Sequence, residues 1–102
     1  MRITELFDNG EFVVTAEVGP PKGFHLDHLV EEASTYLKGI TAVNVTDNQS
    51  SVMRTSTLAT CAKMKEAGLN PIYQTTCRDR NRLALQSDLL GAAALGIEAV
   101  FL

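Results

Sequence analysis

Polar side chains that could do chemistry follow three separate apolar runs of this sequence. They are Glu17 after residues 12–16, Thr46 and Asp47 after residues 43–45, and Gln74 after residues 72–73. Parallel α/β folds build their active sites from polar groups at the carboxyl ends of successive strands. The spacing therefore predicts one site assembled from several strand ends.

Glu17 has two interpretations. As a general acid it must hold its proton near neutral pH, which a dry site favours. As a structural carboxylate it would accept backbone N–H bonds in the turn at Gly19 and Pro20. Because a buried acid is costly without a partner or a task, one of the two roles is expected, and position alone leaves both open.

The loop 46–51 offers hydroxyl, carboxylate and amide groups, including Thr46, Asp47 and Gln49. Such a set suits a polar heterocycle or a ribityl chain. The structural alternative is a turn followed by a helix cap, since Asp, Asn and Ser favour both. The position of the loop after a strand favours ligand binding.

Three arginines, Arg78, Arg80 and Arg82, stand at the start of a predicted helix. They could bind a phosphate at the helix N-terminus. Such a run more often forms surface ion pairs, and we favour this interpretation. Asp79 is then expected to cap the helix. Cys77 has no histidine nearby in the sequence and is expected to pack.

Composition excludes several classes of protein. The 102 residues suit one domain or less, and 45% apolar with 21% charged residues is typical of a globular chain. A net charge of −3 predicts neither a nucleic-acid partner nor an anionic membrane surface. His25 and His28 lack a third ligand at suitable spacing, so no metal site is expected. The amino end lacks an apolar leader, and the two cysteines follow no metal or redox spacing. We therefore expect reduced thiols in a cytoplasmic protein.

Apolar periodicity predicts alternating strands and helices. Helices are expected over 25–38, 54–67 and 79–95, ending at Gly39, Gly68 and Gly96, and strands over 11–18, 41–46, 71–76 and 97–102. The order β-α-β-α-β-α-β requires parallel strands. Because no glycine-rich nucleotide loop follows a strand, a TIM barrel is favoured over a doubly wound sheet. A (βα)8 barrel has roughly 250 residues, so residues 1–102 are expected to be its N-terminal half, truncated after four strands and three helices.

Three stretches carry a resemblance to a known family: 15–22, 43–49 and 74–82, continued by 83–92. They resemble the methylenetetrahydrofolate reductase family, and especially its branch in acetogenic one-carbon metabolism. The resemblance implies an FAD-bound TIM barrel. A reduced nicotinamide, NAD(P)H, reduces the flavin, which then reduces 5,10-methylenetetrahydrofolate to 5-methyltetrahydrofolate.

The resemblance also implies roles for single residues. Glu17 matches the acid that protonates the leaving nitrogen when the folate ring opens, and Thr46 matches a threonine near the flavin. Asp47 and Gln49 fall at flavin-contacting positions where many members carry an aromatic and a small residue. Gln74 stands where histidine is common, and its amide can still donate and accept hydrogen bonds.

Two other functions remain open from the sequence. One is another pterin-binding barrel, such as a methyltransferase, which uses polar strand ends without flavin. The other is a non-catalytic half-barrel that needs a partner, because exposed sheet edges and an uncovered apolar face drive association. A homo-oligomer is expected in either case, or a complex with a partner subunit.

Overall fold

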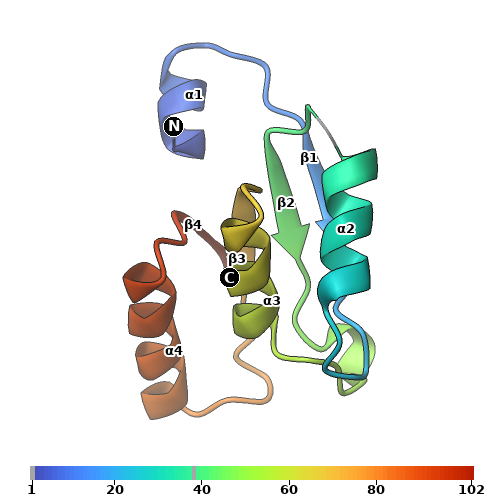
Figure 1. The fold of residues 1–102 in the computed structure, drawn as a ribbon. Helices are drawn as coiled ribbons and strands as arrows, with labels where there is room; N and C mark the ends of the chain where they lie inside the picture. The colour runs from blue at the N-terminus through green and yellow to red at the C-terminus, as the bar shows by residue number, and fades with distance from the viewer. Residues whose placement is uncertain (1, 38) are drawn as a thin grey trace.

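The computed structural model describes residues 2–37 and 39–102 (Figure 1). The elements follow the expected alternation, with one unexpected helix at the amino end and a short 3-10 turn. They are α1 (Ile3–Asp8), β1 (Thr15–Val18), α2 (Asp27–Tyr36), β2 (Ala42–Val45), η1 (Gln49–Ser51), α3 (Thr57–Glu66), β3 (Pro71–Gln74), α4 (Arg82–Ala94) and β4 (Ala99–Phe101).

The four strands form one parallel sheet in the order β1-β2-β3-β4. Each crossover between neighbouring strands contains one of the helices α2, α3 and α4, and Figure 1 shows these helices beside the sheet. Consecutive parallel neighbours joined by helices are the repeating unit of a (βα)8 barrel. The fold is therefore α/β and corresponds to the N-terminal half of a TIM barrel, as predicted.

The core lies between the sheet and the helices. Strand β2 alternates as expected, because Val43 and Val45 are buried while Asn44 points to the other face. The buried strand residues pack with residues of all three crossover helices: Ala33, Cys61, Met64 and Ala92. We call the face that carries Val43 and Val45 the helix face, and the opposite face, with Glu17, Asn44 and Ile72, the open face.

The carboxyl ends of the helices lie next to the glycines that were predicted to end them. Gly68 and Gly96 have φ of +87° and +81°, a conformation that costs glycine little and other residues more. The amino end of α4 differs from the prediction, because Asn81 rather than Asp79 caps it. The Asn81 Oδ1 accepts from Ala84 N–H at 2.8 Å.

The outer strands are less covered than the central ones. Val100 and Phe101 of β4 are exposed, and Phe12, in the stretch before β1, is 92% exposed. The reason is that β1 and β4 are the sheet's edges, so each is paired with a neighbouring strand on one side only. Tyr36, the last residue of α2, is also exposed. No helix among the described residues has the length and apolarity to cross a membrane.

Candidate functional site

The carboxyl ends of the parallel strands meet at one edge of the sheet, which we call the site edge. Strand pairing continues to this edge, since Thr46 N–H donates to the Val18 carbonyl at 3.1 Å and Thr75 N–H to the Phe101 carbonyl at 3.0 Å. Glu17, Thr46 and Gln74 are therefore brought to neighbouring strand ends although they are far apart in sequence. This is the arrangement predicted from the sequence.

Glu17 lies on the open face of β1, with Asn44 of β2 as its partner in the strand register. Its side chain is exposed, so the expectation of an acid in a buried strand is wrong for this structure. The cause is the position of β1 at the edge of the sheet. Glu17 is thus accessible to a ligand at the site edge.

Thr46 is buried, only 2% exposed, directly after β2. Its hydroxyl lies beside Gly19, where an added Cβ would stand 3.5 Å from Oγ1. The absence of a side chain at Gly19 leaves space next to this hydroxyl at the end of β1.

Asp47 forms a two-contact ion pair with Arg80 across two loops of the site edge. Its Oδ1 lies 2.9 Å from Arg80 Nη2, and its Oδ2 contacts Arg80 Nη1 and accepts from Thr76 N–H at 2.9 Å. The Asp47 side chain is 1% exposed and that of Arg80 is 16% exposed. Burial raises the pKa of Asp47, but the hydrogen bonds from Arg80 and Thr76 and the Arg80 charge outweigh it and hold the pKa below its usual value.

The other arginines of the run differ from Arg80. Arg78 pairs with Asp79 at the surface, with Nη2 2.8 Å from Oδ2, and also donates to the Asn48 carbonyl at 3.0 Å. The surface ion pairs predicted for this run are therefore found for Arg78, whereas the pair made by Arg80 is buried. In the sequence, Asp47 and Arg80 stand in the loops that follow two successive strands. Their positions alone did not indicate that the two side chains form a pair.

The loop after β2 holds Gln49 at its 3-10 turn, with the side chain exposed. Three residues of this loop that are not glycine have positive φ: Asn48 at 42°, Ser50 at 61° and Ser51 at 59°. Such conformations are costly and persist where surrounding contacts enforce them, often at functional sites. One enforcing contact is Arg54 N–H donating to Asn48 Oδ1 at 2.9 Å.

The loops after β1 and β2 are also tied together. Arg54 Nη1 donates to the Pro20 carbonyl at 3.2 Å, and Thr55 N–H donates to the Pro21 carbonyl at 2.7 Å. The Thr55 hydroxyl contacts the Gly23 carbonyl as well. Together with the Asp47–Arg80 pair, these bonds connect three successive loops of the site edge.

Several buried polar atoms near the site edge have no hydrogen-bond partner within the part of the chain that the structure describes. They are Asn44 Oδ1, Thr46 Oγ1, Thr75 Oγ1 and Thr76 Oγ1. Unsatisfied buried polar groups are rare in native proteins, and each calls for an explanation such as a bound molecule. Thr46 was predicted as a site residue from the sequence, but Thr76 was not. The sequence feature that could have indicated Thr76 is its position after β3.

Cys77 follows these threonines and is exposed, so the prediction that it packs is wrong. Cys61 of α3 is buried, and burial raises its pKa to about 12 despite a hydrogen bond with Thr57. Both thiols are free. Among the described residues, no cluster of three or more His, Cys, Asp or Glu side chains could hold a metal ion.

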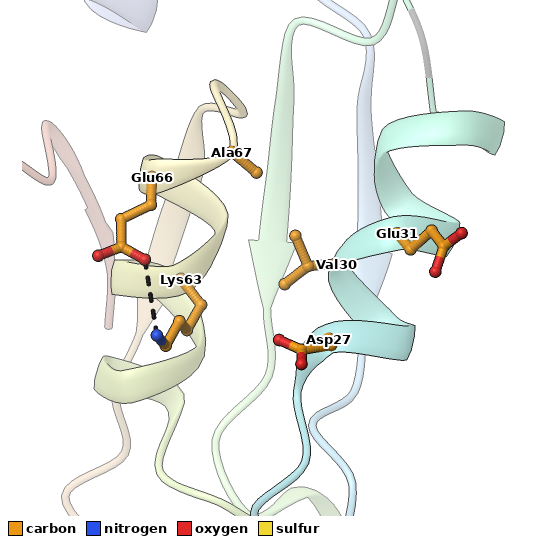
Figure 2. A pocket seen from close by; sticks show the side chains of 6 residues that line it. All are labelled: Asp27, Val30, Glu31, Lys63, Glu66 and Ala67. Atoms are coloured by element: carbon orange, nitrogen blue, oxygen red, sulfur yellow. Dashed lines mark ion pairs between the residues drawn. The ribbon is translucent and has the colours of Figure 1, made fainter.

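Two grooves lie away from the strand-end threonines. Figure 2 shows one of about 340 Å³ between α2 and α3, where Lys63 pairs with Glu66 at 3.6 Å. None of the predicted site residues lines it. A smaller groove of about 190 Å³ between β1 and α2 is lined by Glu17 and Glu32 among others. Glu17 therefore borders open space on two sides.

Comparison with known protein families gives a match over nearly the whole chain. A family model described as methylenetetrahydrofolate reductase matches residues 2–101. No curated protein matches the chain. The matched residues include all four strands and every residue of the site edge described above.

Proposed function

Because the chain belongs to the methylenetetrahydrofolate reductase family, we propose that it forms the amino-terminal half of a barrel that reduces 5,10-methylenetetrahydrofolate to 5-methyltetrahydrofolate. Membership supports an oxidoreductase of folate and one-carbon metabolism. The flavin, the electron donor and the roles of single residues are the finer parts of the proposal. The observation that carries them is the gathering of Glu17 and unpaired hydroxyls at one edge of the sheet.

The site edge fits a flavin. The unpartnered hydroxyl of Thr46 is a buried group that a polar ligand would satisfy, and Gly19 leaves room beside it. Thr46, Gln49 and Gln74 would hold the cofactor through hydroxyl and amide groups. A bound FAD would supply the hydride for the reduction and would itself be reduced by NAD(P)H.

Asp47 was predicted as a flavin contact, and its geometry suggests how it serves the site. Both of its oxygens are engaged by Arg80, and one also by Thr76 N–H. We infer that Asp47 supports the flavin site by holding the loops after β2 and β3 together.

Glu17 is proposed to hold the proton that opens the folate ring. When the bond between the methylene carbon and the ring nitrogen breaks, that nitrogen takes up the proton from the Glu17 carboxyl group. Glu17 is exposed on the open face, so a folate lying across the site edge could reach it. The chain's role in this step is to present the acid and to orient the substrate.

The proposal extends to the surroundings of the enzyme. We propose a cytoplasmic protein that works as a homo-oligomer or with a partner subunit, since the open sheet edges invite association. No membrane or nucleic-acid partner is part of the proposal.

The test separates the two half-reactions in a protein that carries these strands within a complete barrel. Glu17→Gln is expected to lower methylenetetrahydrofolate reduction by at least about 100-fold, because the proton donor is lost, and to leave flavin reduction by NAD(P)H nearly unchanged. Stopped-flow absorbance of the flavin measures both steps. Glu32→Gln is the matched control, since Glu32 borders the same groove from α2.

Two results would contradict the proposal in different ways. Equal loss of both half-reactions would assign Glu17 a structural role. A folded wild-type protein that is colourless and binds no added FAD would remove the flavin-dependent reaction and favour a pterin-binding barrel without flavin.

A further inference from the structure

Asn44 occupies the middle of the sheet on the open face. It lies in β2, between Glu17 of β1 and Ile72 of β3 in the strand register. Side chains paired in this way stand on the same face of neighbouring strands, which lie about 4.8 Å apart. The Asn44 amide is therefore within reach of groups on both neighbours.

The Asn44 amide oxygen lacks a donor. The residue is half-buried, and its Oδ1 is fully buried without a hydrogen-bond partner among the described residues. An asparagine in the middle of a strand is itself unusual, because strands favour β-branched and aromatic residues. A polar residue at a position that Val or Ile would suit better indicates a task for its amide.

The side chains beside Asn44 limit which group can donate a hydrogen bond to its Oδ1. Ile72 has no polar side-chain atom, and the Thr46 hydroxyl, two positions along β2, makes no hydrogen bond to Asn44. This leaves Glu17 as the register neighbour with a side chain that can hydrogen-bond. An ionised carboxylate only accepts, whereas a protonated carboxyl group can donate its O–H.

We propose that Asn44 is a positioning residue, whose Oδ1 accepts the O–H of protonated Glu17 and holds the carboxyl group toward the site edge. The catalytic meaning of this contact rests on the proposed function, in which Glu17 is the proton donor. The contact itself requires the pairing of β1 with β2 and a protonated Glu17, but no cofactor or substrate.

The contact between Asn44 and Glu17 depends on the protonation state of Glu17, because only the acid form has an O–H to donate. In the acid form of Glu17, the Asn44 Oδ1 accepts the O–H and fixes the direction in which the carboxyl group points. When a leaving nitrogen takes this proton, the O–H bond of Glu17 breaks and a new N–H bond forms. The Asn44 Nδ2 group can then donate to the carboxylate that remains, so the residue serves both states.

The test is an NMR titration of the chain without flavin or folate. In the wild-type chain, the side-chain NH2 resonances of Asn44 are expected to move between about pH 3 and pH 6, the range in which carboxyl groups titrate. In Glu17→Gln this response is expected to disappear. In Glu32→Gln it is expected to remain, since Glu32 lies on α2 and borders Glu17 from the helix side.

Two outcomes would overturn the inference. One is a wild-type chain whose Asn44 resonances stay fixed over this range. The other is a response that survives in Glu17→Gln, which would assign it to another carboxyl group, such as Glu32 or the paired Asp47. Glu17 is exposed, so Glu17→Gln is expected to fold normally. Because no cofactor or substrate is present, this result is independent of the half-reaction test of the proposed function.

Discussion

At the scale of single residues, the Asp47–Arg80 pair is the contact on which the site edge depends most. It joins residues 33 positions apart and is almost fully buried on the Asp47 side. Arg80 Nε also lies 3.5 Å from Asp88 of α4, so the guanidinium links two loops to a helix. Burying a charge is tolerated only where a partner compensates it, and here each charge has one.

We expect Arg80→Ala to lower the free energy of unfolding by about 3–5 kcal/mol, because it leaves the Asp47 carboxylate buried without its partner. Urea unfolding followed by circular dichroism measures the change. Arg78→Ala is the control, since the Arg78–Asp79 pair is exposed, and it is expected to have a far smaller effect. A similar loss in both variants would show that the run of arginines acts as one charged surface.

The same pair predicts how stability depends on pH. The pKa of Asp47 is lowered in the folded state, so its contribution is present above the unfolded value of about 3.9 and is lost as the pH falls through the lower folded value. The stability difference between wild type and Asp47→Asn should therefore be larger at pH 7 than near pH 2. A difference that does not change with pH would contradict the ion-pair account.

At the scale of elements, α3 is anchored to the sheet by its buried face. Thr57, Cys61 and Met64 of this helix are all buried, and the Thr57 hydroxyl donates to the Val45 carbonyl at 3.0 Å. Thr60 is buried on the same face of the helix. Helix and strand are thus joined by packing and by one buried hydrogen bond.

The two cysteines should report on this anchoring. We expect one thiol, Cys77, to react quickly with a disulfide reagent in the native chain, because it is exposed. Cys61 should react only on unfolding, because it is fully buried and its pKa is raised to about 12. Absorbance of the released thiolate, with and without urea, counts the reacting groups.

Cys77→Ser provides the control for this measurement, since it should remove the fast reaction and leave the slow one. Two fast thiols in the native wild-type chain would contradict the packing of α3 against the sheet.

At the scale of the whole molecule, the described chain is a sheet covered by helices on one side. The opposite face and both sheet edges are accessible, and β4 presents the exposed apolar side chains Val100 and Phe101. An accessible strand edge with apolar side chains is a surface on which other strands pair. The architecture of half a barrel therefore favours association.

We expect the 11.1 kDa chain to sediment as a dimer or a larger species. Phe101→Lys should shift it toward the monomer, because a charge on an edge strand opposes pairing. Tyr36→Lys, which changes an even more exposed aromatic side chain on α2, should not. A wild-type chain that sediments as a single monomeric species would contradict this view of the open edges.

Much of this architecture follows from local patterns. Glycines at helix ends, alternation along β2 and apolar periodicity in the helices depend on residues a few positions apart, so the order of elements was predictable. Helix α1 was missed because its six residues form too short a periodic pattern. The bounds of β1 were too long because the apolar residues before Thr15 resemble a strand but are exposed.

The sequence by itself determined which polar groups stand at strand ends, and hence that Glu17, Thr46 and Gln74 share one edge of a parallel sheet. Only the tertiary structure decided what each of them meets there. The tertiary structure pairs Asp47 with Arg80, leaves Glu17 exposed and places Asn44 beside Glu17. The physical reason is that contacts between loops and exposure to solvent depend on distances between residues far apart in the chain, which no local periodicity encodes.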